Sequence, residues 1–202
     1  MGLERELERH ASLDERFDPA ARIVEHDPTW AAQAREELRR LEKALAPMQV
    51  RLEHVGSTAV PGLAAKSIID LQLSVASMDP RARYLGPLER LGYLFVPNPE
   101  SPDYHLFAKP PWRPRSHHVH VCRIGSRNEF RHLAVRDYLR AHGEEAARYA
   151  ALKRELAQRY PRDRLAYIEG KDRYVGGLEA RAVAWAAARP GGPRIAGPGA
   201  VL

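Results

Sequence analysis

The chain has 202 residues, of which 44% are hydrophobic and 29% charged, a composition that fits one globular domain and excludes a wholly disordered chain. Its net charge of +6 comes from basic residues spread along the sequence beside acidic ones, which predicts a solvated surface and argues against a nucleic-acid partner. No apolar run is long enough to span a membrane and no signal peptide opens the sequence, so we expect a cytoplasmic protein without a membrane partner.

The chain divides into three segments by composition and pattern. We treat the charged, weakly periodic residues 1–20 as an N-terminal extension and residues 21–189 as one domain. Residues 190–202 are rich in glycine and proline and are predicted to be disordered. The first helix is expected to open at Asp27, which can cap the free amides, with Pro28 in the first helical position and an apolar stripe of Ala34, Leu38, Leu41 and Leu45.

Strand and helix patterns then follow one another along the domain. Alternating or continuous apolar residues predict strands over 50–55, 68–75, 93–96, 104–109 and 118–122. Helical spacing predicts helices that end at Gly92, run from the Ser126-x-x-Glu129 capping box to Gly143, and cover 144–160 and 167–188. Together these elements predict an α/β domain. We expect Tyr149, Leu152 and Leu156 to form the buried stripe of the second-to-last helix.

One turn and one acidic residue carry the chemical signal. Gly56 and Ser57 follow a predicted strand, and Asp70 lies on the next one. A Gly-Ser turn lets backbone amides and a hydroxyl approach a phosphate, while a carboxylate on the neighbouring strand can hold a divalent metal. The same spacing also fits a tight turn beside a buried, hydrogen-bonded aspartate, and the two interpretations remain open at this point.

The run His54-Val-Gly-Ser-Thr-Ala-Val-Pro-Gly-Leu-Ala-Ala-Lys-Ser-Ile-Ile-Asp70 resembles the signature of the GrpB family of the nucleotidyltransferase superfamily. The resemblance extends from about Val24 to Leu178. It implies a nucleotidyltransferase-like mixed sheet of about four or five strands flanked by helices. It also implies that the Gly56–Ser57 turn contacts nucleotide phosphates and that Asp70 binds magnesium or manganese. Thr58 and Lys66 are further candidates for phosphate binding, although the position of Lys66 fits a solvated loop lysine equally well.

The sequence departs from the superfamily pattern at the second acid. Position 72 is Gln72, and the later strand offers His118 and His120 where a third carboxylate is often found. These three residues join Asp70 as candidate metal ligands, although imidazole suits zinc or manganese better than magnesium. We therefore do not expect a complete two-magnesium site. A hydrogen-bonded core pair is the alternative for the two histidines, which share one strand face by their spacing.

Three other residues are candidates for the cleft. Glu53 precedes the Gly-Ser turn and either points into the cleft or remains an exposed edge carboxylate. Tyr167 and Lys171 lie one helical turn apart and, by the family resemblance, cap the cleft. Arg136 and Asp137 are expected to form a structural ion pair.

The sequence thus predicts a metal-dependent nucleotidyltransferase-like protein. It would transfer a nucleoside monophosphate from a nucleoside triphosphate to a small acceptor, with Asp70 and His120 as the catalytic residues. Because the second acid is missing, a non-catalytic nucleotide-binding or regulatory module is the main alternative. A basic RNA-associated protein is a third hypothesis, and the sequence predicts neither the acceptor nor the oligomeric state.

Overall fold

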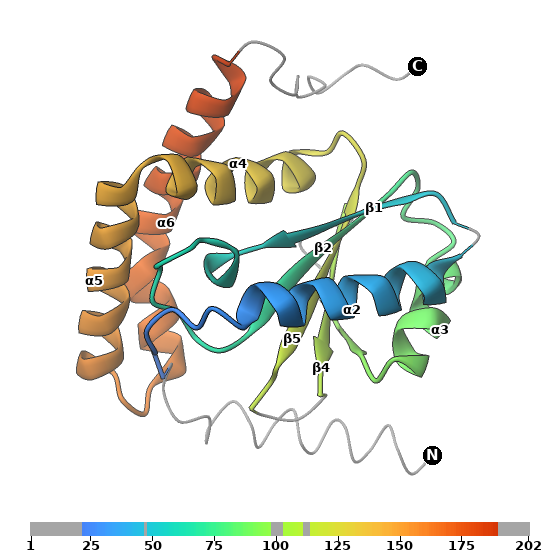
Figure 1. The fold of residues 1–202 in the computed structure, drawn as a ribbon, viewed down its shortest axis with the longest axis horizontal. Coiled ribbons are helices and arrows are strands. Elements are labelled where there is room, and N and C mark those ends of the chain that lie inside the picture. The colour runs from blue at the N-terminus through green and yellow to red at the C-terminus, as the bar shows by residue number, and fades with distance from the viewer. Residues whose placement is uncertain (1–21, 47, 98–102, 111–113, 190–202) are drawn as a thin grey trace.

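The computed structural model describes residues 22–46, 48–97, 103–110 and 114–189, so the predicted extension 1–20 and tail 190–202 lie outside the described residues. The described part of the chain forms one sheet with helices around it (Figure 1). Its elements are, in order, α2 (Trp30–Leu45), β1 (Val50–Val55), the 3-10 helix η1 (Ser57–Ala59), β2 (Ile69–Val75), α3 (Ala82–Arg90), β3 (Leu94–Val96), β4 (Tyr104–Lys109), β5 (His117–Arg123), α4 (Arg127–Ala141), α5 (Gly143–Arg159) and α6 (Arg164–Ala187).

The sheet has five strands in the order β1-β2-β5-β4-β3. Strands β2 and β5 run parallel, whereas all other neighbouring strands run antiparallel. A parallel pair needs a crossover, which α3, β3 and β4 supply between β2 and β5. The predicted α/β fold with a mixed sheet of four or five strands and flanking helices is therefore confirmed.

The side chains of β2 alternate between two environments. Ile69, Leu71 and Leu73 are completely buried in a core that also contains the apolar stripe of α2. Helix α2 crosses this face of the sheet in Figure 1. Asp70 and Gln72 point to the opposite face, where Gln72 is hydrogen-bonded to a histidine of α4. The alternate polar residues predicted in this strand thus mark a polar sheet face beneath the C-terminal helices.

Helices α4, α5 and α6 pack on one another and close the polar face. Phe130 and Ala134 of α4 form a small apolar cluster with Ala182 and Ala186 of α6. Helices α5 and α6 lie side by side in Figure 1 and contact each other. Among the described helices, none combines the length and the apolar content needed to cross a membrane.

Two helix starts differ from the prediction by more than one residue. Helix α2 begins at Trp30, because the Asp27 carboxylate accepts a hydrogen bond from the Thr29 amide before the helix starts. Helix α6 begins at Arg164, three residues before the predicted start, because the Asp163 carboxylate caps it through the Ala166 amide. The other predicted cap is confirmed, since the Ser126 hydroxyl accepts a hydrogen bond from the Glu129 amide.

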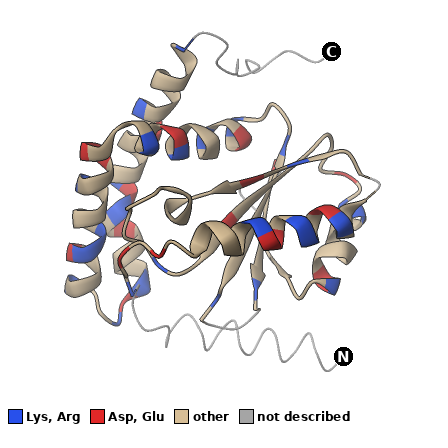
Figure 2. Ribbon diagram, viewed as in Figure 1, with Lys and Arg blue, Asp and Glu red and all other residues tan. Residues whose placement is uncertain are grey.

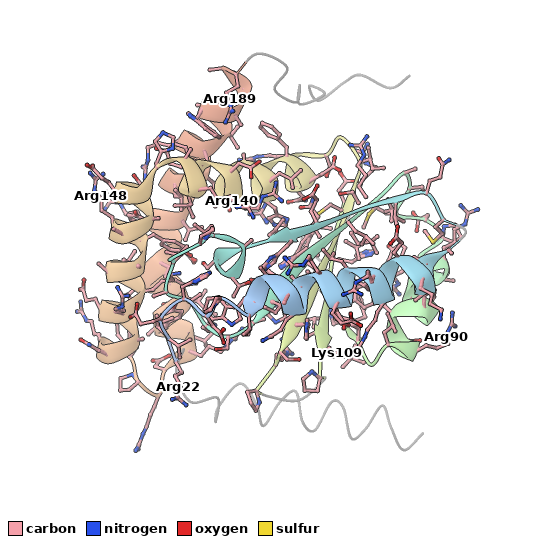
Figure 3. The ribbon with its side chains drawn as sticks, in the orientation of Figure 1. Arg22, Arg90, Lys109, Arg140, Arg148 and Arg189 are labelled. Atoms are coloured by element: carbon pink, nitrogen blue, oxygen red, sulfur yellow. The ribbon has the colours of Figure 1, made fainter. Side chains whose placement is uncertain are left out.

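Charged residues of both signs are interspersed over the helices. Figure 2 shows lysine and arginine alternating with aspartate and glutamate along α2, α4 and α5. The labelled side chains of Arg22, Arg90 and Arg189 lie at separate edges of the molecule (Figure 3). This distribution agrees with a solvated surface, in which the net charge is not concentrated on one element.

Candidate functional site

Gly56 directly follows β1 and lies next to Asp70 of β2. The residue before it, Val55, is the antiparallel partner of Asp70 on β2. Gly56 has a φ of 71°, and a Cβ atom added there would lie 2.5 Å from Oδ2 of Asp70. Both the backbone angle and this close approach require glycine. Because glycine has no side chain, the backbone of the turn that begins with Ser57 can lie against the Asp70 carboxylate.

Asp70, His118 and His120 form a compact cluster on two neighbouring strands. Asp70 is the parallel partner of His118, and the period of two places His120 on the same face of β5. Nδ1 of His118 and Nε2 of His120 each lie 3.1 Å from Oδ1 of Asp70. One ligand atom from each residue lies within 4.8 Å of the other two. The Asp70 side chain is 26% exposed, so the cluster is open to solvent.

The protonation states of this cluster follow from its contacts. Burial acts to raise the pKa of Asp70, but hydrogen bonds from His118 and His120 outweigh it and hold the pKa far below its usual value. Burial also lowers the pKa of His118, although the neighbouring carboxylate acts in the opposite direction. An ionised carboxylate and a neutral imidazole are the forms that bind metal ions.

A pocket of about 210 Å³ opens beside Asp70 and Ser57. We call it the lysine pocket because Lys66, Lys153 and Lys171 line it. Asp70 is the one acidic residue among the described residues of its lining. Three amines therefore face a single carboxylate, an imbalance that favours an anionic ligand with more than one negative charge.

Lys153 is the most buried of these lysines, with 3% of its surface exposed. Its Nζ donates hydrogen bonds to Oγ of Ser57 at 3.1 Å and to the Ala64 carbonyl at 2.5 Å. Burial, reinforced by the nearby cations of Lys171 and Arg154, lowers the pKa of Lys153 to about 7. The protein thus holds an amine against the Gly-Ser turn at a cost in charge solvation.

A second pocket, of about 170 Å³, adjoins the first, and we call it the histidine pocket because His120 and His132 line it. Asp70 and Ser57 line both pockets, whereas His118 lines only the lysine pocket. The Asp70 carboxylate therefore lies where the two pockets meet. The rest of the histidine pocket is largely apolar, with Val55, Val135, Leu139, Tyr149, Val175 and Leu178 in its lining.

Besides Asp70, the charged residues of the histidine pocket are Arg131 and Glu179, with Nη1 of Arg131 2.6 Å from Oε1 of Glu179. His132 lies deeper, and burial lowers its pKa well below the usual value, so its imidazole is neutral. Its Nδ1 lies 3.0 Å from the amide oxygen of Gln72. The histidine pocket thus combines an apolar lining with a few fixed polar groups, as small-molecule sites do.

The structure brings most of the predicted site residues to these two pockets. Lys66, Tyr167 and Lys171 line the lysine pocket, with the ammonium groups of both lysines over the Tyr167 ring. Thr58 lines it as well, but its hydroxyl is bonded within the fold to His54 and to the Ile68 carbonyl.

Two predicted candidates lie apart from the pockets. Gln72 is 1% exposed, and its amide oxygen accepts a hydrogen bond from His132. Glu53 lines neither pocket, and its carboxylate lies 2.7 Å from Nη1 of Arg136. Arg136 also pairs with Asp137 at 2.7 Å, which is the structural ion pair that the sequence predicts.

Several residues of the two pockets and their surroundings were not predicted to belong to the site, among them Tyr104, His132, Tyr149 and Lys153. Tyr149, predicted as core, is only half-buried and lines both pockets. One signal could have found Lys153, because it follows Tyr149 by four residues and therefore lies on the buried stripe of α5, where an amine needs an explanation. Tyr104 and His132 come from other elements, and no local pattern relates them to Asp70.

Curated relatives resemble this chain over most of its length. The UPF0157 protein PA4798 of Pseudomonas aeruginosa is 43% identical over 171 residues, which cover 83% of this chain and 69% of that protein. A dephospho-CoA kinase of Mycolicibacterium paratuberculosis is 32% identical over 189 residues and 82% of this chain, but the match spans only 46% of that longer protein.

A solved structure and a family model both resemble this chain over most of its length. The crystal structure of the conserved protein GrpB from Enterococcus faecalis matches with a TM-score of 0.75 and 34% identity, over 81% of this chain and 98% of that one. The family model described as GrpB protein matches residues 20–181. Its match includes the Gly-Ser turn, the Asp-His-His cluster and the three lysines, and the chain therefore belongs to the GrpB family.

Proposed function

We propose that this protein is a metal-dependent nucleotidyltransferase that moves a nucleoside monophosphate from a nucleoside triphosphate to a small acceptor. The observation that carries the proposal is the position of Asp70 and Ser57 at the junction of the lysine and histidine pockets. A group-transfer enzyme must hold a donor and an acceptor on two sides of one reacting centre, and two pockets that share a carboxylate fit this requirement.

The lysine pocket suits the triphosphate of the donor. Lys66, Lys153 and Lys171 offset negative charge, and the hydroxyl of Ser57 already accepts a hydrogen bond from Lys153. In the transfer, the oxygen of an acceptor hydroxyl forms a bond to the α-phosphorus while the bond from that phosphorus to the bridging oxygen breaks, so that pyrophosphate leaves and the hydroxyl proton passes to solvent. The lysines stabilise the charge that develops on pyrophosphate, which is how phosphoryl transfer is generally accelerated.

The histidine pocket suits a small acceptor with an apolar body. Its lining provides apolar contacts through Val135, Leu139 and Leu178, and the Arg131–Glu179 pair can orient a polar substituent. Asp70 and His120 line it and, together with His118, would hold the metal ion, which supplies charge neutralisation at the phosphate. We assign no role in transfer to Glu53, which lies outside both pockets.

One observation favours the second candidate, a nucleotide-binding module without catalysis. The position that carries the second acid in the superfamily is Gln72, whose oxygen is bonded to His132. The site therefore has one carboxylate among its candidate ligands. The kinase activity in one relative's name is not proposed for this chain, because its sequence has no Gly-x4-Gly-Lys-Ser/Thr loop.

Calorimetry with ATP, GTP, CTP and UTP, in the presence of divalent metal, tests the proposal. We expect one nucleotide to bind and Lys153→Met with Lys171→Met to weaken its binding at least about 100-fold, since two buried charge-assisted contacts are lost. Lys43→Met, which removes one charge from an exposed lysine of α2, is the control for loss of positive charge outside the pocket. Unchanged nucleotide affinity in the double variant contradicts the proposed triphosphate site.

An assay of pyrophosphate release separates the two candidate functions. Release that depends on an added acceptor supports the transferase, and binding without release under any acceptor supports the module. Binding to RNA alone, with a steep dependence on salt, would replace both by the RNA-associated hypothesis.

A further inference from the structure

The donor atoms of the Asp70–His118–His120 cluster do not fit the magnesium ion that the family resemblance implies. Magnesium requires oxygen ligands in near-octahedral geometry. The cluster offers one carboxylate and two imidazole nitrogens. The nearest further oxygen donor on the strand, the amide of Gln72, is already bonded to His132 at 3.0 Å. A set of two nitrogens and one oxygen is instead typical of zinc and iron sites.

We propose that Asp70, His118 and His120 form a three-ligand site for a zinc-class transition-metal ion, in place of the two-magnesium carboxylate site of the superfamily. Three protein ligands leave at least one position of a tetrahedral ion open, as in catalytic zinc sites. The inference deepens the proposed function and rests on it only for what the ion would do in phosphate transfer. Metal binding itself rests on the geometry of the cluster.

Sheet register explains how histidine takes the place of the missing acid. In the parallel pairing of β2 and β5, Asp70 lies beside His118 and Gln72 lies beside His120. The imidazole of His120 reaches back along the strand, so that its Nε2 lies 3.1 Å from Oδ1 of Asp70. A donor atom from β5 thus lies next to Asp70, although the second position of β2 carries the amide of Gln72 and no carboxylate.

Other contacts hold the ligands in orientation, as expected around a metal site. The phenol oxygen of Tyr104 lies 2.7 Å from Nδ1 of His120, the ring nitrogen that faces away from Asp70. This contact fixes the ring and leaves Nε2 for the ion. On the other side, the backbone at Gly56 approaches Oδ2 of Asp70 so closely that no side chain fits between them. Through its contact with His120, Tyr104 acts as a positioning residue.

The buried surroundings of His118 add a separate observation. Its Nε2 is buried without a hydrogen-bond partner among the described residues, while its Nδ1 faces Asp70. Nδ1 of His118 is therefore the ring nitrogen that converges with Nε2 of His120 on Oδ1 of Asp70. Nε2 of His118 has no contact among the described residues of the kind that Tyr104 makes with His120, so only one of the two imidazoles is oriented by a second contact.

Metal titration of the chelator-treated full chain tests the inference without any nucleotide. Calorimetry with zinc, cobalt, manganese and magnesium chlorides should show one zinc or cobalt ion per chain and no magnesium binding at the same concentrations. His118→Ala and His120→Ala should each lower zinc affinity at least about 100-fold, and Tyr104→Phe about tenfold. His117→Ala is the control, because His117 lies on the same strand but points to the other face.

X-ray absorption of the zinc form of the natural sequence gives a second measurement that needs no variant. We expect two imidazole nitrogens at about 2.0 to 2.1 Å and oxygen in the remaining positions. Zinc affinity that is unchanged in the double His118→Ala, His120→Ala variant overturns the inference, as does a zinc spectrum without imidazole or a preference for magnesium. Zinc binding as expected with no nucleotide binding would leave the metal site standing and remove only the proposed transferase function.

Discussion

The two faces of strand β2 serve different purposes. Leu71 and Leu73 point into an apolar core against α2 and are 0% exposed. Asp70 directly precedes Leu71 in the sequence, and its side chain points to the opposite face, into a polar site with two histidines. The comparison shows that the apolar face provides stability through burial, while the polar face keeps charged groups partly desolvated for binding.

The largest expected effect is a loss of stability at Leu71, in contrast to a loss of metal binding at its neighbour Asp70. Leu71→Ala should lower the free energy of unfolding by about 2 to 5 kcal/mol, because it leaves a cavity in the core. Asp70→Asn keeps the shape and a hydrogen-bond acceptor but gives up the ionised form that the two histidines stabilise, so we expect a smaller loss of stability than in Leu71→Ala together with a loss of metal binding. Urea denaturation and metal calorimetry on both variants measure this contrast. A large stability loss in Asp70→Asn with normal metal binding would make Asp70 a structural residue.

An intermediate effect is expected at the Gly-Ser turn. Gly56→Ala and Gly62→Ala both place a side chain at a positive φ, of 71° and 77°, which costs about 1 to 3 kcal/mol. Only the Cβ at position 56 would collide with the Asp70 carboxylate, because nothing lies within 4 Å of one at position 62. We therefore expect both variants to lose stability and only Gly56→Ala to lose metal binding. Equal metal affinity in the two variants would show that the close approach is not needed for the site.

The smallest effect is a pH dependence that arises from Lys153. Its pKa of about 7 means that the amine is charged below neutral pH and increasingly neutral above it. Binding of ATP should therefore weaken by about tenfold between pH 6 and pH 8. Lys153→Arg stays charged over this range and controls for the titration of the ligand itself. If ATP binding by Lys153→Arg has the same pH dependence as ATP binding by the natural sequence, Lys153 does not contact the phosphates.

The stability of the protein should respond to the same amine with a defined sign. Between pH 7 and 10.5 the unfolded chain binds more protons at Lys153 than the folded one does, so this residue makes stability rise with pH across that window. Below pH 7 the folded protein carries the full free-energy cost of keeping a charged amine buried at Lys153. Lys153→Met removes it, and its melting temperature at pH 6 should equal or exceed that of the natural sequence.

Local patterns were sufficient for most of the fold. Alternation in residues 68–75 and 118–122 predicted β2 and β5, and the Ser-x-x-Glu box predicted the start of α4, because these signals depend on neighbours in sequence. The two corrected helix starts show the limit of such signals. Asp27 and Asp163 are both acceptable caps, and only the path of the chain before each helix decides which amides they meet.

The site was predicted in part. Gly56, Ser57, Asp70 and the two histidines stand out because a turn and two short strands carry them. The sequence could not predict Tyr104 or His132, since β4 and α4 bring them to the site, whereas the buried stripe of α5 offered a local signal for Lys153. It also gave no reason to expect Tyr149 at the wall of both pockets rather than in the core.

By itself, the sequence determined the elements, the family and the chemical character of the turn, since each depends on residue types at short spacing. Only the tertiary structure decided that Asp70 meets His118 and His120 at one oxygen atom, through the parallel register of β2 and β5. It also decided that three lysines from a loop and two helices converge on one pocket. Register and helix packing are set by contacts between distant segments, and no local pattern contains them.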